Sequence, residues 1–292
     1  MINLPLYIFT NDESFPLHIQ YGFHDKSLYV HGHEDFSELT IILNGTAEHI
    51  VDNEIYPISK GDVFVINNDT QHGFLNTKDF KICNIMYKPS IIWEHNFDIM
   101  DTTGFKALFI IEPHYSQKIK FCSHLKLNAR QFIFIKDFID NMILEYNQKE
   151  DGWRTLVFSN FVYLIVMLSR WYDLNFKDVG NHLLKLSTAI NYIENNYSKK
   201  ITISTLAKLS GYSERQFIRI FKSTFLMTPS TYITNYRMKK AQQLINTSNL
   251  SIGEIAYLCG YDDNNYFSRV FKNYTGITPT EFRCNNRNSN DI

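Results

Sequence analysis

The sequence predicts an α+β protein of two domains: an N-terminal β-barrel followed by two helices, and an all-α C-terminal domain. Three observations indicate this fold class. Short β-prone runs separated by turn residues fill the chain up to about Met86. Apolar residues at helical spacing begin near Asn128, and one sequence motif occurs twice in the last third. At 292 residues the chain is long enough for two domains.

The expected barrel covers residues 1–127. Asn44-Gly45 and Asp52-Asn53 are strong turn signals between β-prone runs. Many short strands at close spacing favour a sandwich or a barrel. We expect strands at Leu39–Leu43, Ala47–Val51, Ile55–Ile58, Val63–Ile66, His72–Leu75 and Phe80–Tyr87.

Residues 128–175 are expected to form two helices that complete the first domain. Phe132, Ile135 and Ile139 fall at spacings of three and four. Arg154–Tyr172 is apolar around most of a helix, so it is buried against its own domain or against a partner subunit. We expect these helices to form the surface of a homodimer. The most apolar run, Phe161–Leu168, is far shorter than the roughly 20 residues of a membrane span, so no membrane contact is expected.

Charge is distributed unevenly along the chain. The net charge is −1, but residues 183–292 carry 14 Lys and Arg against 7 Asp and Glu, or +7, and residues 1–182 carry −8. A basic half facing a polyanion would explain the asymmetry.

The four cysteines are scattered without a C-x-x-C pair, and the N-terminus lacks the pattern of a signal peptide, so we expect a cytoplasmic protein with free thiols. They are Cys83, Cys122, Cys259 and Cys284.

The last third contains an internal repeat. Leu206-Ala207-x-Leu209-x-Gly211-Tyr212 recurs 49 residues later as Ile255-Ala256-x-Leu258-x-Gly260-Tyr261. Phe217-x-Arg219-x-Phe221-Lys222 recurs 50 residues later as Phe267-x-Arg269-x-Phe271-Lys272. Each copy has the features of a helix-turn-helix: a small residue where two helices cross, a glycine that ends the first helix, and a polar cap for the second. The motifs are expected at 204–225 and 252–274, within an all-α domain at 185–287.

The outward side chains of these motifs suit double-stranded DNA. Arginine bonds to guanine edges in two places, and asparagine or glutamine does the same with adenine. The lysines near the helix ends suit phosphates, as do Arg237, Lys239 and Lys240 on the helix between the copies. The expected DNA-binding residues are Arg215, Gln216, Arg219, Lys222, Asn264, Asn265, Arg269 and Lys272.

The stretch from Ile201 to Arg283 resembles the DNA-binding domain of AraC/XylS-type transcription regulators. The second copy carries the resemblance most clearly, in Gly260-Tyr261, Asn265-Tyr266-Phe267-Ser268-Arg269, Phe271-Lys272 and Thr278-Pro279. The resemblance implies seven helices, with a long central helix joining two motifs that enter successive major grooves.

A second set of polar residues is expected inside the barrel. His31 and His33 are one residue apart on a strand and therefore point the same way, and Glu38 and His72 can join them from neighbouring strands. Three imidazoles and a carboxylate could ligate a divalent transition metal. They could equally bond the hydroxyl groups of a sugar, or simply satisfy each other in a filled barrel. The cofactor prediction is therefore open, with no firm metal.

The spacing His31-x-His33-x4-Glu38 with Gly61-x10-His72 resembles the two motifs of cupin barrels. A wider set resembles the sensor domains of L-rhamnose-responsive regulators of the AraC/XylS type. It comprises His31-x-His33-x-x-Phe36-x-Glu38-Leu39, Tyr56-x-Ile58-x-x-Gly61-Asp62-Val63-Phe64, His72 and Asn84-Ile85-x-Tyr87-x-Pro89. This resemblance implies a carbohydrate effector.

The sequence therefore predicts a DNA-binding transcription regulator and not an enzyme. It is expected to activate carbohydrate-utilisation genes by recruiting RNA polymerase when a small sugar occupies the barrel. Two alternatives remain open at this point. One is a metal-dependent cupin enzyme with a helical tail, which would need a metal with an open coordination position. The other is a regulator that has no effector.

Overall fold

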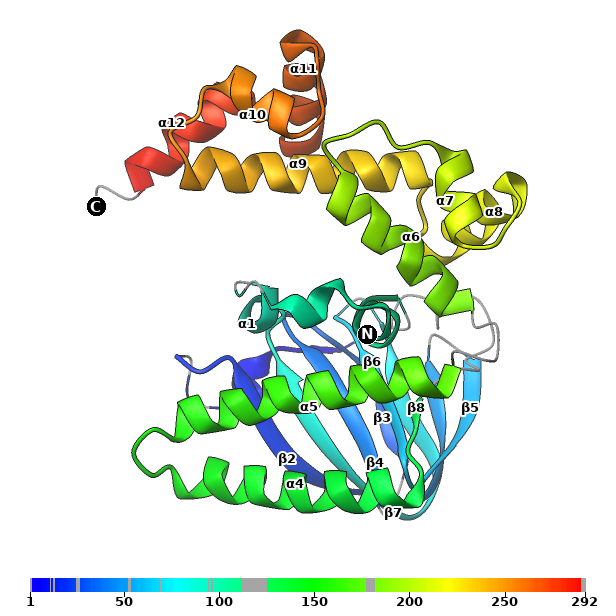
Figure 1. Ribbon diagram of the computed structural model, residues 1–292. Coiled ribbons are helices and arrows are strands. Elements are labelled where there is room, and N and C mark those ends of the chain that lie inside the picture. Colours follow the sequence, from blue (N-terminus) through cyan, green and yellow to red (C-terminus); the bar gives the residue numbers. More distant parts are fainter. Residues whose placement is uncertain are drawn as a thin grey trace. The chain divides into compact units, whose positions relative to one another are not determined.

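The structure is a computed structural model that describes residues 2–289, apart from 11, 13, 25–26, 52–53, 69, 94, 96, 112–124 and 177–181. The chain forms two compact units, Met1–Ser187 and Thr188–Ile292. The first unit contains the β-sheet and two long helices, and the second is helical (Figure 1). The two classes of structure are thus separated along the chain as the sequence predicts.

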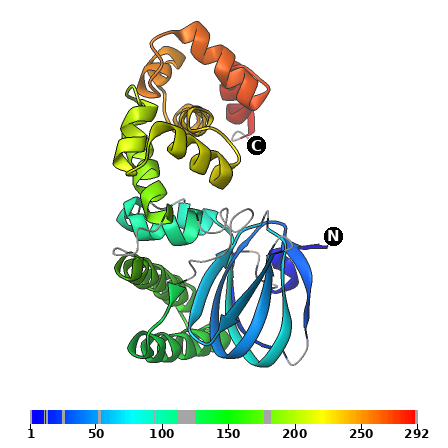
Figure 2. The same cartoon turned by 90° about the vertical axis from the view of Figure 1, so that its right-hand side faces the viewer.

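The first unit is built on a mixed sheet that curls strongly (Figure 2). Among the described residues the strands run in the order β1-β3-β7-β4-β6-β8, with β2 also paired to β7 and β5 also paired to β4. All pairs are antiparallel except β1 with β3. The strands are β1 Asn3–Leu4, β2 Leu17–His24, β3 Leu28–His33, β4 Ser37–Val51, β5 Glu54–Ser59, β6 Asp62–Ile66, β7 His72–Tyr87 and β8 Leu125–Lys126.

The expected turn at Asn44-Gly45 is wrong, because β4 continues through these residues. Gly45 has a φ of 77°, and the register with β7 shifts on both sides of it, which marks a β-bulge. The bulge bends β4, so that its first half pairs with β6 and its second half with β5. The two expected strands at 72–75 and 80–87 are likewise one strand, β7, with irregular backbone at Asn76 and Asp79. The expected turn at Asp52-Asn53 lies outside the described residues.

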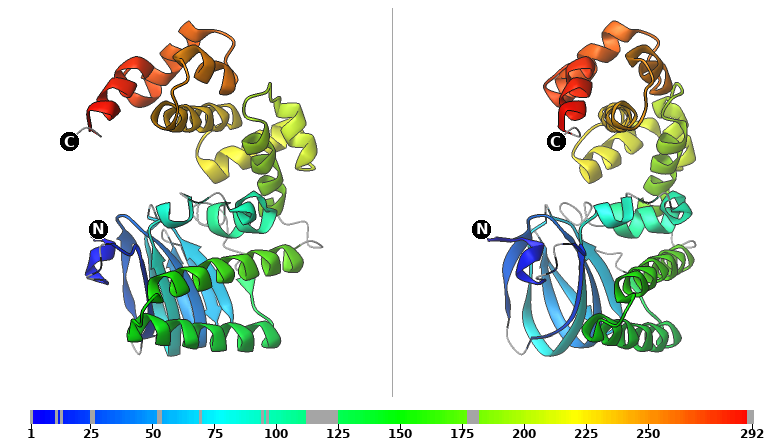
Figure 3. Two further views of the ribbon diagram at one scale, coloured as in Figure 1. Left: turned by 60° about the vertical axis from the view of Figure 1, so that its left-hand side comes forward. Right: turned by 90° about the vertical axis from the view of Figure 1, so that its left-hand side faces the viewer.

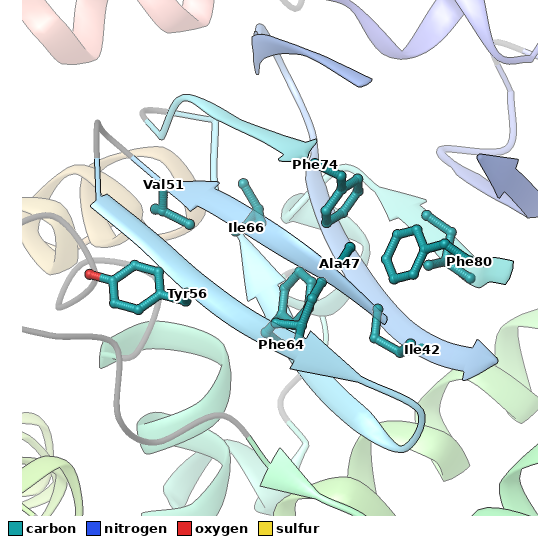
Figure 4. Close-up of a cluster of buried hydrophobic side chains, with 10 residues drawn as sticks. Ile42, Ala47, Val51, Tyr56, Phe64, Ile66, Phe74 and Phe80 are labelled. Carbon is teal, nitrogen blue, oxygen red and sulfur yellow. The ribbon is translucent and has the colours of Figure 1, made fainter. Parts of the chain in front are cut away.

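The buried interior of the sheet is aromatic and aliphatic (Figure 4). Side chains from β4, β5, β6 and β7 converge there because alternate residues of each strand face the same side. The cluster comprises Ile42, Ala47, Val51, Tyr56, Ile58, Phe64, Ile66, Phe74, Phe80 and Ile82. His49 belongs to the same layer and stacks on Phe64, with ring centroids 4.5 Å apart.

Two long helices follow the sheet and lie side by side against it (Figure 3). α4 spans Ala129–Gln148 and begins with a capping box between Asn128 and Gln131. α5 spans Trp153–Phe176. Short helical segments connect β7 to this region: α1 Ser90–Trp93, η2 Asp98–Asp101, α2 Thr103–Phe105 and η3 Lys106–Ile111; another, η1 Leu6–Ile8, follows β1.

By length and composition alone, α5 could cross a membrane over Trp153–Asn175. In the fold, however, the face carrying Phe161, Leu164 and Leu168 is fully buried within the first unit. The Phe161 ring lies 5.0 Å from that of Tyr87 on the sheet. α5 is therefore the core helix that the sequence predicts.

The second unit contains seven described helices, counting α6, which begins in the first. They are α6 His182–Asn196, α7 Ile203–Leu209, α8 Glu214–Phe225, α9 Pro229–Thr247, α10 Ile252–Leu258, α11 Asn264–Thr275 and α12 Pro279–Ser289. The two pairs α7–α8 and α10–α11 lie within one residue of the motif ranges expected at 204–225 and 252–274.

Candidate effector pocket and DNA-reading surface

The first helix-turn-helix consists of α7 and α8. Gly211 adopts a φ of 66° between them, as the sequence predicts for the residue that ends α7. The Ser213 hydroxyl accepts the Gln216 N–H and caps α8. Among the described residues, no hydrogen bond returns from the Gln216 side chain to Ser213, so this amide is available to a ligand. Phe217 and Phe221 are fully buried and hold α8 against its own domain.

The second helix-turn-helix consists of α10 and α11. Gly260 adopts a φ of 79°, and the Asp263 carboxylate caps α11 by accepting the Asn265 and Tyr266 N–H groups. The Asn264 side chain rests close to Gly253 of α10, since a Cβ on that glycine would lie 3.0 Å from its amide nitrogen. This contact positions one of the two expected adenine-reading amides.

All eight expected DNA-binding side chains are exposed on α8 or α11. In each helix the buried phenylalanines occupy one face and the polar residues the other, which is the arrangement needed to present side chains to a groove. On α11 the Arg269 guanidinium lies over the exposed Tyr266 ring, 5.7 Å from its centroid. Arg237 differs from the expected phosphate contact, because its guanidinium binds two main-chain carbonyls within the domain.

In the first unit, the structure brings His31, His33, Glu38 and His72 together. They come from β3, β4 and β7, and all four are at most 6% exposed. His31 lies opposite His72 in the β3–β7 ladder. The Nε2 atoms of His33 and His72 are 3.1 Å apart, and Nε2 of His33 is 3.8 Å from Oε2 of Glu38.

Burial keeps this cluster uncharged over a wide pH range. Burial and, to a smaller extent, the nearby His31 lower the pKa of His33 to about 3. Burial also lowers the pKa of His31 and of His72. Burial raises the pKa of Glu38 to about 7, against a hydrogen bond from the Thr40 hydroxyl that lowers it. His33 and Glu38 are therefore a neutral pair, and not an ion pair, between about pH 3 and pH 7.

The cluster borders a cavity of about 160 Å³. His31, Glu38 and His72 line it, whereas His33 lies behind them against the Phe36 ring. None of the described lining residues is a lysine or arginine. The other lining residues are Leu4, Phe9, Gln20, Gly22, His24, Leu28, Tyr29, Phe74, Asn84 and Met86.

Several polar lining residues were not among the residues expected to bind an effector. Gln20 and Asn84 face each other across the β2–β7 ladder, and Thr40 is opposite Asn84 on β4. The Thr40 hydroxyl lies 2.9 Å from Glu38 Oε1 and 3.2 Å from Asn84 Oδ1. The alternation of apolar residues along Leu17–Phe23 could have indicated β2, but no local signal pairs that strand with β7.

The donor set fits a divalent transition metal. Ligand atoms of His31, His33 and His72 all lie within 4.8 Å of one another. His31 Nδ1 is 3.1 Å from the Tyr29 carbonyl, and a bond there leaves Nε2 free to coordinate. The Nδ1 atoms of His33 and His72 are buried without a hydrogen-bond partner among the described residues, so the supporting contacts usual for metal ligands are incomplete.

Comparison with known proteins agrees with both halves of this structure. Residues 206–285 match the model of a helix-turn-helix domain, and residues 18–86 match that of a cupin domain. The chain is 26% identical over 275 residues to the HTH-type transcriptional activator RhaR of Mannheimia succiniciproducens, covering 94% of each. It is 26% identical to RhaS of Yersinia pestis, covering 88% of this chain and 90% of that activator.

A solved AraC-type regulator from Chromobacterium violaceum is 32% identical over 35% of this chain and 91% of that one, with a TM-score of 0.34. The two domain matches, together with RhaR and RhaS, identify a helix-turn-helix transcription regulator with a cupin domain. The chain thus carries an AraC-type helix-turn-helix domain and a cupin domain, as the sequence predicts.

Proposed function

We propose that this regulator activates transcription when an uncharged sugar occupies the cupin cavity and that it reads DNA through α8 and α11. The exposed polar faces of two matched reading helices carry the DNA part of the proposal. The occupied cavity shifts the population towards the arrangement that engages DNA and recruits RNA polymerase. Because such a regulator binds chromosomal DNA, we expect it in the cytoplasm.

The cavity supports a small, uncharged effector. At about 160 Å³ it is well below the roughly 300–1,000 Å³ of sites for drug-sized ligands. The buried Glu38 and His72 and the partly buried Asn84 suit hydroxyls, while Phe74 and Met86 offer an apolar face. A carboxylate or phosphate would meet Glu38 with no lysine or arginine among the described lining residues, and burying such a charge unpaired is costly. Sugar acids and sugar phosphates should therefore bind poorly.

The effector proposal is tested by thermal shift of the intact chain against neutral monosaccharides and their uronic acids and phosphates. His72→Ala should abolish the shift given by the best neutral sugar, whereas His95→Ala, outside the cavity, should keep it. Tighter binding of the acids than of the parent sugar would contradict the proposed selectivity. No shift with any sugar would favour a regulator without an effector.

The reading-helix proposal is tested with duplexes selected by the intact chain from a random-sequence pool. Arg219→Ala and Arg269→Ala should each weaken binding by about 1–3 kcal/mol and relax base preference at one position. Equal affinity of both variants and the unaltered protein at fixed salt would refute the assignment.

A bound metal is the second candidate for the cluster, favoured by the three converging imidazoles. His31, His33, His72 and Glu38 would hold it, and it would polarise a bound hydroxyl as a Lewis acid. Metal analysis of the purified chain tests this.

We propose that the cavity binds its effector without altering it. Recovery of chemically unchanged sugar after incubation supports a sensor, and a modified product would support the enzyme alternative.

We propose that the first unit also forms a homodimer through α4 and α5. Phe134 and Tyr163 are 40% and 45% exposed, and their rings lie against those of Phe138 and Trp171. An exposed aromatic cluster of this kind is typical of an interface. Phe134→Glu should yield monomers in sedimentation at micromolar concentration. Ile55→Glu, an equally apolar exposed site on β5, should not.

A further inference from the structure

Arg237 lies on α9, the long helix that connects the two helix-turn-helix motifs (Figure 1). Its Nε donates to the carbonyl of Tyr197 at 2.7 Å, and one Nη donates to the carbonyl of Lys199 at 2.9 Å. Both carbonyls belong to the segment between α6 and α7. The guanidinium thus uses two donors on the main chain just before the first motif begins.

The same guanidinium contacts the turn of the second motif. Its Cζ lies 5.2 Å from the centroid of the Tyr261 ring. The turn itself comes very close to the segment before α7: a Cβ on Gly260 would lie 2.7 Å from the carbonyl oxygen of Ser198 and 2.9 Å from Arg237 Nη2. One side chain therefore joins three segments: the residues before α7, the middle of α9 and the turn between α10 and α11.

This junction links the two reading units by a second route, besides the covalent path along α9. Three residues after Lys199, Thr202 caps α7 and so starts the first motif. Tyr261 lies two residues before Asp263, which caps α11. Two linked binding modules gain affinity only when their separation matches that of their sites. Successive major-groove sites are about 34 Å apart, so a small rotation of one motif would misplace its helix.

We propose that Arg237 is a positioning residue that fixes the separation and rotational phase of α8 and α11, and thereby the spacing of the two DNA half-sites that the protein accepts. The inference rests on the proposed function of α8 and α11. Arg237 acts through main-chain contacts and need not touch DNA. A phosphate contact, the role expected from its charge, is the competing explanation.

The probe is the duplex selected by the intact chain, compared with versions that have one half-site scrambled or one base pair added or removed between the half-sites. Arg237→Met should lower affinity for the selected duplex about tenfold, because avidity between the two motifs is lost. It should leave single half-site binding unchanged and reduce the penalty for altered spacing. The dependence of affinity on salt should stay as in the unaltered protein, since no phosphate contact is removed.

Arg237→Lys separates the two explanations. An ammonium group keeps the charge but lacks the planar fork that reaches two carbonyls, so positioning should not be restored. Gly260→Ala perturbs the same junction while keeping the arginine, and it should also weaken discrimination between spacings. Lys208→Met removes an exposed charge on α7 and serves as the control. Circular dichroism melting identifies any variant that fails to fold.

Wild-type spacing discrimination in both Arg237→Met and Gly260→Ala, with both folded, would overturn the inference. The inference would also be overturned by a second result. In it, Arg237→Lys fully restores spacing discrimination, and the salt slope falls by about one in Arg237→Met, as it does when a phosphate contact is lost. Failure of Arg219→Ala and Arg269→Ala to weaken binding would instead refute the reading helices themselves.

Discussion

Replacing Glu38 by glutamine should stabilise the first unit above neutral pH. The carboxyl is buried in the cavity wall, and burial raises its pKa from 4.5 to about 7. Below pH 4.5 the Glu38 carboxyl is protonated in both the folded and the unfolded chain, so its ionisation does not affect the free energy of unfolding. Between pH 4.5 and 7 the unfolded chain ionises first, so folding stability falls as pH rises.

The size of the effect follows from the same shift. Each pH unit in this window costs about 1.4 kcal/mol, so the carboxylate destabilises the folded unit by about 3 kcal/mol at pH 8 and by less than about 1 kcal/mol at pH 5. A glutamine carries no charge and can still accept the Thr40 hydroxyl. For a unit of this size the gain corresponds to about 6–12 °C in melting temperature at pH 8.

Tryptophan fluorescence isolates the transition, because Trp93, Trp153 and Trp171 all belong to the first unit. Unfolding should be followed with a chelator present at pH 5 and pH 8. The pKa values of His31, His33 and His72 are lowered, so these histidines contribute less to folding stability as pH falls. This contribution is the same in the unaltered protein and in Glu38→Gln, and it cancels when their stabilities are subtracted. Glu34→Gln, on an exposed carboxyl, is the control. An equal Glu38→Gln difference at both pH values would refute the reasoning.

Three further changes test other parts of the structure. Asp263→Ala removes both hydrogen bonds that cap α11 and should cost about 1 kcal/mol in circular dichroism unfolding; no loss would contradict the cap. Gly45→Ala should cost more than about 1 kcal/mol, because its Cβ would lie 2.2 Å from the Lys78 carbonyl at a φ of 77°. Gly152→Ala, at a similar φ but in open space, should cost less, and equal losses would exclude the steric explanation. Lys222→Ala should weaken all duplexes alike and lower the salt slope by about one; a change of base preference would place this lysine at a base instead.

The helices could be predicted because their signals are local. Caps such as Ser213, glycines such as Gly211 and buried phenylalanines at helical spacing lie within a few residues of each other. The reading faces followed from the same periodicity. The role of Arg237 on α9 could not be predicted. Its charge suggested a contact with a DNA phosphate, and only the folded chain places it beside the carbonyls of Tyr197 and Lys199.

The strands were harder because their partners are distant in sequence. Asn44-Gly45 has the residues of a tight turn, but pairing of β4 with β5, β6 and β7 turns it into a bulge. The period of two placed His31 and His33 together correctly. Gln20 and Asn84 were not expected to line the effector site, since 64 positions separate them and only the β2–β7 ladder makes them neighbours.

That ladder also has a kinetic consequence. Leu17 pairs with Tyr87, so closing the sheet brings together residues about 70 positions apart, whereas the helical unit forms from near neighbours. After denaturation we expect the helices of the second unit to refold first, and the sheet to follow within milliseconds to seconds. Synthesis reverses the order. At about 5–20 residues per second, translating the last 105 residues gives the sheet a lead of about 5–20 s. A newly made chain should therefore close its cavity before its DNA-reading helices are complete.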